Sequence, residues 1–130
     1  MKAQISVEYI LITALVLLML SPIFYYAFST SVQSIKMNQV AALVDDLADS
    51  ADVLYSLGPN SQDTLKITVP GGVTNITIAN TEISVFIRLF NAVSEAHRTT
   101  NGNVSGSINI SSGIHYVTVK NENNTIKITD

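Results

Sequence analysis

The N-terminal part of the chain is almost continuously apolar. No charged residue lies between Glu8 and Lys36, and the run from Ile5 to Tyr26 is rich in Leu, Ile, Val and Ala. Such a run exceeds the roughly 20 residues that an α-helix needs to cross a ~30 Å hydrocarbon layer. The pattern therefore predicts a hydrophobic helix that can lie in a membrane.

A second pattern extends this helix beyond the apolar run. Apolar side chains recur at intervals of four and three residues, which is one face of an amphipathic helix: Val40, Val44, Leu47, Ala51 and Leu54. Gly58 and Pro59 then end it. A helix from Ile5 to Leu57 would be roughly 80 Å long at a rise of 1.5 Å per residue. No core of a 130-residue globule is that long, so we expect part of the helix to pack against other molecules.

Pro22 interrupts the apolar run. A proline removes one backbone hydrogen bond, so we expect a kink or a loosened turn around residues 18–22. Ser21 can bond to a carbonyl that the proline frees. A functional hinge and a proline that the membrane helix merely tolerates both fit this pattern.

After Pro59 the apolar residues recur at every second position, which is typical of β-strands. Leu65, Ile67 and Val69 alternate with polar residues, and Pro70-Gly71-Gly72 predicts a turn. We expect further strands at 73–78, 107–110, 114–120 and 125–129, with turns at 101–102, 112–113 and 123–124.

Residues 81–98 fit two periods. Alternation from Ile83 to Leu89 indicates a strand, whereas the spacing from Ile83 to Val93 also suits a helix. The β-branched content favours the strand. Six or seven short strands predict a small antiparallel β-sandwich of immunoglobulin-like type, or a barrel. The expected fold class is α+β, with a helix over residues 4–57 and a β-sandwich head over 58–130.

Composition and charge narrow the classes of function. Seven basic and ten acidic side chains leave a net charge of −3, so nothing indicates a nucleic-acid partner. Without cysteine the chain has no disulfide and no thiolate metal ligand.

Motifs for catalysis or metal binding are missing from the sequence. His97 and His115 have no ligand spacing around them, which predicts surface or half-buried strand histidines. No nucleophile elbow, phosphate loop or paired-carboxylate motif stands out, so we expect no enzyme, no cofactor and no metal site. Four aspartates lie on the predicted helix rather than in a calcium loop, which indicates a solvated face or charge contacts between subunits: Asp45, Asp46, Asp49 and Asp52.

Four Asn-x-Ser/Thr sequons lie in the predicted head, at Asn75, Asn103, Asn109 and Asn123. Attached glycans would shield and solubilise an extracellular domain. A turn-rich polar sequence also contains such triplets by chance, so both interpretations stay open.

The first residues carry the most specific motif. The basic Lys2 is followed by Gln4, Ser6 and Glu8 at alternate positions, just before the apolar run. This stretch resembles the Gln-x-Ser-x-Glu-x-x-x-Leu pattern of archaeal type IV-like pilins with a class III signal peptide. Ile12 stands where that pattern has leucine. The resemblance is close over residues 1 to about 20. The predicted head resembles the β-rich heads of these pilins only in its general pattern.

The resemblance implies that a membrane-embedded prepilin peptidase cuts between Ala3 and Gln4. Residues 1–3 would then be a leader, and the apolar helix would stay in the mature protein. The resemblance also implies that Glu8 neutralises the N-terminal ammonium of a neighbouring subunit during assembly. An unpaired carboxylate at membrane depth costs a few kcal/mol, and a partner charge lowers that cost. Alternatively, Glu8 lies at the level of the lipid headgroups, and cyclisation of Gln4 would remove the ammonium.

By this family analogy we expect a structural pilin subunit. The precursor would lie in the cell membrane, and the assembly machinery would build copies of it into an extracellular helical filament, with adhesion as the task. The alternative is a monomeric, single-pass membrane-anchored binding module. An ordinary cleaved secretory signal fits poorly, because the apolar run is longer than its usual core and ends in bulky residues: Phe24, Tyr25, Tyr26 and Phe28.

Overall fold

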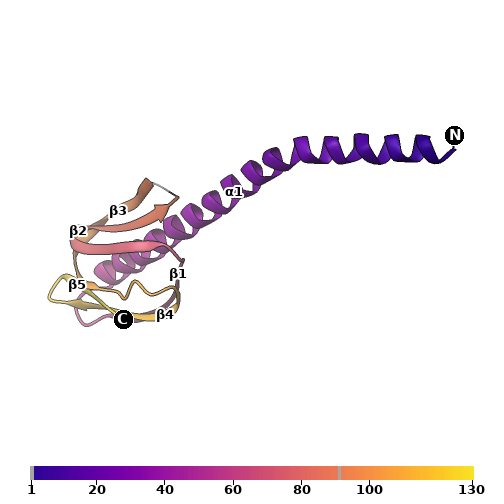
Figure 1. Ribbon diagram of the computed structural model, residues 1–130. Coiled ribbons are helices and arrows are strands. Elements are labelled where there is room, and N and C mark those ends of the chain that lie inside the picture. The colour runs from indigo at the N-terminus through magenta and orange to yellow at the C-terminus, as the bar shows by residue number, and fades with distance from the viewer. Residues whose placement is uncertain (1, 91) are drawn as a thin grey trace. The chain divides into compact units, whose positions relative to one another are not determined.

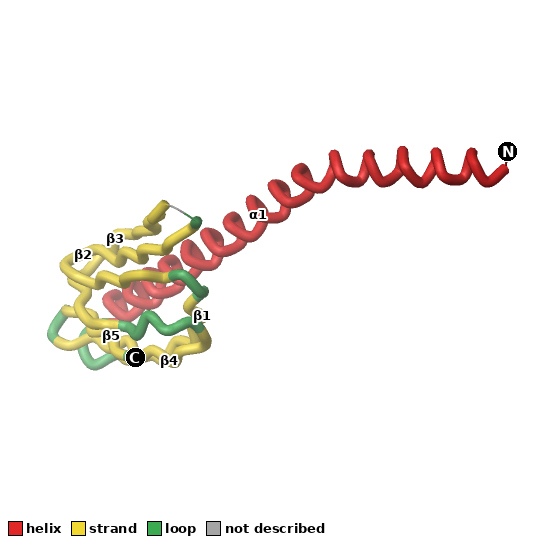
Figure 2. The backbone as a smooth tube through the Cα atoms, viewed as in Figure 1, coloured by secondary structure: helices red, strands yellow, loops and turns green. Residues whose placement is uncertain are grey.

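The computed structural model describes residues 2–90 and 92–130, with side chains from Gln4 onward. One long helix precedes five strands, which short loops connect (Figures 1 and 2). The chain divides into two compact units, Met1–Ser34 and Ile35–Asp130. The elements are α1 (Lys2–Leu57), β1 (Gln62–Val69), β2 (Val73–Leu89), β3 (Ala92–Ser107), β4 (Gly113–Glu122) and β5 (Thr125–Thr129).

The helix ends where the sequence predicts. Gly58 follows its last residue with a φ of 90°, a conformation that glycine adopts without steric cost, and its N–H donates to the Tyr55 carbonyl at 3.3 Å. Pro22 lies inside α1, and the helix continues through it without a break. A local kink or loosened turn around residues 18–22 stays a prediction.

The strands form one five-stranded sheet in the order β1-β4-β5-β3-β2. Its pairs are antiparallel except for β3 and β5, which run parallel. The β4–β5 hairpin turns through Asn123 and Asn124, both with positive φ (52° and 65°). Asparagine tolerates this left-handed conformation, which explains why these two residues occupy the turn. The predicted turn at 123–124 is confirmed.

Strand β2 folds back on itself at Asn80. This residue has a φ of 58°, and the register of β2 against β3 shifts directly after it. The Arg88 N–H donates to the Gly72 carbonyl at 2.8 Å, and the Thr74 hydroxyl donates to the Phe86 carbonyl at 3.3 Å. The two ends of β2 therefore lie side by side, and the element consists of two arms.

Within the second unit, the end of α1 supplies the layer that covers the sheet. The predicted apolar stripe from Val40 to Leu54 is buried, together with Leu43 and Ala48. It packs against inward side chains of all five strands, among them Ile67, Val85 and Ile126. The core is thus a helix-on-sheet core, built from alternate strand residues and one face of the helix.

Buried polar contacts join the end of α1 to the sheet. Asn121 of β4 is fully buried, and its side-chain amide donates to the Leu54 carbonyl at 3.0 Å. Ser61 donates to the same carbonyl at 2.9 Å. The last turn of a helix leaves carbonyls without partners, and these two side chains satisfy one of them where water is excluded.

The α+β class and the long N-terminal helix are confirmed. The immunoglobulin-like arrangement is not confirmed: the strands lie in a single sheet, and its second layer is a helix. Residues 81–89 and 92–98 are strand, as their β-branched content favours, whereas Phe90 is a turn residue with a φ of 49°. The strand predicted at 107–110 is wrong, because β3 ends at Ser107, and residues 101–102 lie inside β3 instead of forming a turn between strands. Gly102 suits that place because a Cβ there would clash with the Tyr55 ring.

His115 ties the C-terminal residue to β4. Its Nδ1 lies 2.7 Å from a carboxylate oxygen of Asp130, and its Nε2 lies 2.9 Å from the Ser111 carbonyl oxygen. The hydrogen bond to the Ser111 carbonyl, followed by the contact with Asp130, raises the pKa of His115 above its ordinary value of 6.5. Both acceptors favour the doubly protonated ring.

Truncation of Leu47 should destabilise the second unit. Leu47 is fully buried, so Leu47→Ala leaves a cavity and should lower the free energy of unfolding by about 2–5 kcal/mol. Leu57 on the same helix is 69% exposed and gives the matched control, with a change within about 0.5 kcal/mol. Urea unfolding of the full-length chain in detergent micelles, followed by circular dichroism, measures both. Equal losses in the two variants would contradict the helix-on-sheet core.

The stability of the second unit should depend on pH through His115. Because its pKa is raised in the folded protein, its contribution is complete below pH 6.5 and is lost as the pH rises through the folded pKa. Lys120 lowers the pKa of Glu122, and the resulting contribution to stability is complete above pH 4.5 and is lost only in acid, so it does not change across neutral pH. Unfolding free energies across neutral pH should therefore fall with pH in the native chain and less steeply in His115→Gln. An unchanged slope in His115→Gln, with His97→Gln as the control, would refute this assignment.

Candidate functional site

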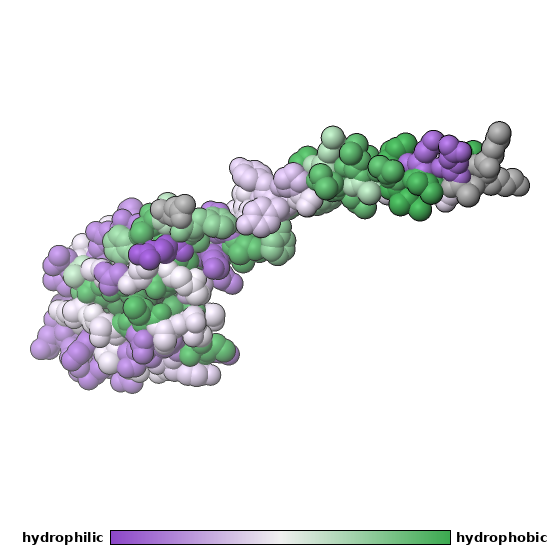
Figure 3. All heavy atoms as spheres, viewed as in Figure 1, coloured by the Kyte–Doolittle hydropathy of each residue, from purple (hydrophilic) through white to green (hydrophobic). Residues whose placement is uncertain are grey.

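The N-terminal half of α1 exposes its apolar side chains on all sides. Every side chain from Gln4 to Phe28 is exposed, with Tyr9 at 71%, Leu18 at 74% and Tyr25 at 75%. On the face that Figure 3 shows, hydrophobic residues cover most of this part of the helix after its first turns. Leaving so much contiguous apolar surface in water is unfavourable, which indicates that the segment works in contact with lipid or another protein.

Several Ser and Thr hydroxyl groups in and just after this part of the helix bond to its own backbone. Thr13 donates to the Tyr9 carbonyl at 2.8 Å, and Thr30 donates to the Tyr26 carbonyl at 3.0 Å. Ser31 bonds in the same way to the Ala27 carbonyl at 2.9 Å. Side chains bonded within the helix need no water, so they suit an apolar environment. Within the described residues, α1 is the one helix long and apolar enough to cross a membrane.

The motif residues lie on the first turns of α1. Gln4 and Glu8 are four positions apart and so share one face of the helix, whereas Ser6 lies on another. All three are exposed, and Glu8 forms no ion pair with the side chains that the structure describes. The side chains of Lys2 and Ala3 are outside the described residues. The geometry therefore leaves the Glu8 carboxylate available to a partner outside the chain.

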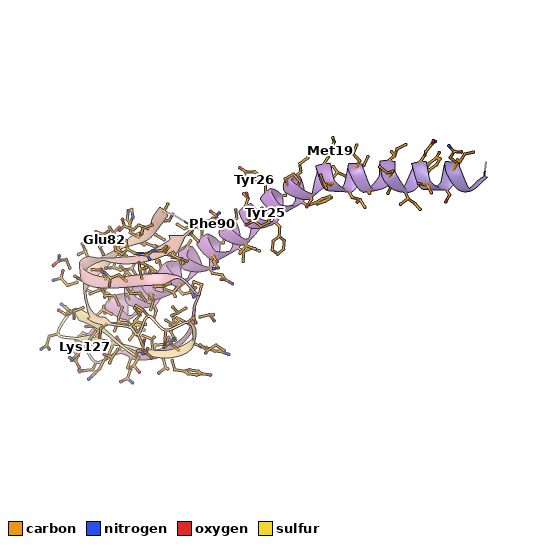
Figure 4. All side chains as sticks on the ribbon, viewed as in Figure 1. Met19, Tyr25, Tyr26, Glu82, Phe90 and Lys127 are labelled. Atoms are coloured by element: carbon orange, nitrogen blue, oxygen red, sulfur yellow. The ribbon has the colours of Figure 1, made fainter. Side chains whose placement is uncertain are left out.

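Four aromatic residues mark the end of the apolar run: Phe24, Tyr25, Tyr26 and Phe28. All are highly exposed, and the two tyrosines project from the helix just after the segment that contains Met19 (Figure 4). Aromatic side chains with a polar edge gather at membrane–water interfaces. Their position is that expected for one end of a membrane-embedded segment.

The four sequon asparagines are exposed. Asn75 lies in β2 and Asn103 in β3, whereas Asn109 follows β3 and Asn123 forms the β4–β5 turn. Exposure makes each accessible to a glycosyltransferase, and glycosylation stays a prediction. The predicted strand histidines are also found, with His97 exposed in β3 and His115 half-buried in β4.

The acidic row on the helix is not simply a solvated face. Arg98 of β3 donates to Asp45 at 3.1 Å and to Asp49 at 2.7 Å, and the Asn101 N–H donates to the Asp52 carboxylate at 2.7 Å. The hydrogen bond to Asp45 and the charge of Asp49 raise the pKa of Arg98. Three aspartates thus bind β3 to the helix. The pairing with Arg98 was not predicted from the sequence, where the four-residue spacing of Asp45 and Asp49 was the available signal.

Comparison with known protein families gives a match for the N-terminal segment. Residues 2–26 match the family model described as Class III signal peptide. The matched region contains the Gln4, Ser6 and Glu8 motif and the apolar run, and it is consistent with a type IV-like pilin precursor. No curated protein and no solved structure matches the chain. The family match therefore concerns the N-terminal segment and does not extend to the sheet.

Proposed function

We propose that this chain is a structural pilin subunit that polymerises through α1 into an extracellular type IV-like pilus. The observation that carries the proposal is a class III signal peptide placed directly on a helix whose apolar side chains are exposed on all sides. A signal peptide cut behind its apolar run would discard that helix. A cut between Ala3 and Gln4 would keep it, so the mature subunit would retain a surface that other copies can cover.

The physics of such a helix allows both storage and assembly. Lipid tails and packed apolar side chains are similar environments, so transfer from a bilayer into a helical bundle involves little hydrophobic free energy. Close packing and rare polar contacts then decide the arrangement. Lipid would hold the precursor, with the aromatic residues 24–28 at the membrane surface, and sister helices would hold the assembled subunit.

Glu8 is the group best placed to define the register of assembly. It is exposed on the first turns of α1 and has no partner among the described side chains. Once Gln4 is the first residue, each subunit offers one ammonium and one carboxylate a single helical turn apart. Pairing the carboxylate of one subunit with the ammonium of the next would neutralise both charges in an apolar bundle.

The second unit would form the outer part of the filament. Its core is complete within residues 35–130 of the chain, and its four sequons are exposed. A shielded polar domain on an apolar stem suits the outside of a cell. Adhesion to surfaces or cells is the task we propose for it, by analogy with other pili.

Processing should remove Met1, Lys2 and Ala3 and nothing more. Intact-mass analysis of the protein isolated from its native membranes or surface should give a chain that begins at Gln4, with or without loss of ammonia from a cyclised Gln4. An inactive prepilin peptidase should leave the full precursor in the membrane. A mature chain that starts after Phe28 would refute the proposal, and an unprocessed chain would favour the anchored monomer.

Replacement of Glu8 should separate membrane insertion from assembly. Removing one partner of a desolvated charge pair costs about 3 kcal/mol or more, roughly a hundredfold in the association constant of each subunit. In cells that express Glu8→Ala, the processed subunit should accumulate in membranes while filaments disappear from the sheared surface fraction.

Two controls make this result specific. Glu122→Gln removes a carboxylate of the second unit and should leave filaments intact. A mass spectrum of the accumulated Glu8→Ala subunit should begin at Gln4, which distinguishes failed assembly from failed processing. Normal filaments from the Glu8→Ala variant would exclude any assembly role for this carboxylate.

A further inference from the structure

Three side chains on the outer face of β2 and β3 bring metal-binding atoms together. One carboxylate oxygen each of Glu82 and Glu95 and one ring nitrogen of His97 all lie within 4.8 Å of one another. All three residues are exposed (Figure 4 labels Glu82). We propose that these residues form a binding site for a divalent transition-metal ion of the zinc type. The proposal stands on the second unit alone and does not depend on filament assembly.

The strand register explains why these residues meet. Glu95 and His97 are two positions apart in β3, so their side chains leave the same face of the sheet. His97 pairs with Ser84 across the antiparallel ladder, and Glu82 lies two residues before Ser84 on that face. The Glu82 and Glu95 side chains therefore reach the His97 ring from opposite directions along the strands, and the ring is the centre of the cluster.

The fold of β2 fixes the position of Glu82. The fold-back at Asn80 and the register shift come directly before it. The Ser84 hydroxyl donates to a Glu82 carboxylate oxygen at 3.1 Å and orients this group. Partners that hydrogen-bond to a ligating carboxylate are a usual part of metal sites.

The charge balance of the cluster favours a bound cation. Among the residues that the structure describes, no Lys or Arg nitrogen lies within 4.0 Å of a Glu82 or Glu95 carboxylate oxygen. Two carboxylates that share a small volume repel each other, and a divalent ion would replace this repulsion with attraction. Elsewhere on the sheet, Glu122 has a basic partner, since the Lys120 nitrogen lies 3.0 Å from its carboxylate.

The donor set selects the kind of metal. One imidazole nitrogen with two carboxylate oxygens suits Zn²⁺ and its neighbours, whereas Ca²⁺ and Mg²⁺ prefer oxygen ligands alone. Three protein ligands leave the fourth tetrahedral position of Zn²⁺ open to water or to a group from another molecule. The proposal reverses the expectation from the sequence that the chain holds no metal site. That expectation considered spacing along the chain, while Glu82 reaches His97 only through the pairing of β2 with β3.

Titration of the metal-free full-length protein with Zn²⁺ in detergent micelles tests the site. Isothermal titration calorimetry should show saturable binding of one ion. His97→Ala should weaken it by about tenfold or more, and Glu95→Gln and Glu82→Gln should each weaken it measurably. The matched controls are His115→Gln and Glu122→Gln, which remove the same groups elsewhere on the sheet and should bind Zn²⁺ as the native chain does.

Nuclear magnetic resonance of the histidine rings gives a second readout. Zn²⁺ should shift the ring signals of His97 and leave those of His115 in place, and Ca²⁺ at the same concentration should shift neither. All three site residues are exposed, so circular dichroism should show that their variants remain folded. The proposal is overturned by an absence of saturable Zn²⁺ binding, by equal binding in His97→Ala, or by ring shifts at His115 alone.

Discussion

The N-terminal half of α1 exposes apolar side chains on all its sides, and the rest of the proposal follows from this constraint. Side chains that are exposed on all sides of a helix can be stable in lipid or in a bundle of similar helices, but not in water. A class III signal peptide over residues 2–26 places the processing motif before this surface rather than behind it. The mature chain would therefore keep the apolar helix, and a filament core is the assembly that we propose covers it.

The same helix meets a different requirement after Ser34. There the inward side chains of the five strands cover its apolar stripe from Val40 to Leu54 within the second unit. The buried amide of Asn121 satisfies the Leu54 carbonyl at the helix end, and Arg98 pairs with Asp45 and Asp49 along the exposed flank. A change in hydrophobic pattern along one helix thus separates a part that needs other molecules from a part that folds against its own chain.

The two faces of β3 carry different polar chemistry. Arg98 points to the helix and is held by two aspartates, while Glu95 and His97 point outward and meet Glu82 of β2. On the first face Arg98 and the aspartates neutralise each other's charges. On the second face, in our proposal, a metal ion neutralises the two glutamates. Because neighbouring residues in a strand alternate between faces, adjacent positions can serve these separate purposes.

The sequence alone determined the features that depend on local order in the chain. The apolar run, the stripe from Val40 to Leu54, the helix end at Gly58 and the motif at residues 4–8 are all readable from spacing, because helix periodicity, chain termination and signal peptides are local properties. Only the tertiary structure decided the single sheet and the parallel β3–β5 pair. The same holds for the hydrogen bond from Asn121 to the Leu54 carbonyl and for the proximity of Glu82 to His97. These features depend on which strands become neighbours, and that choice is made by burial of the whole core rather than by any one segment.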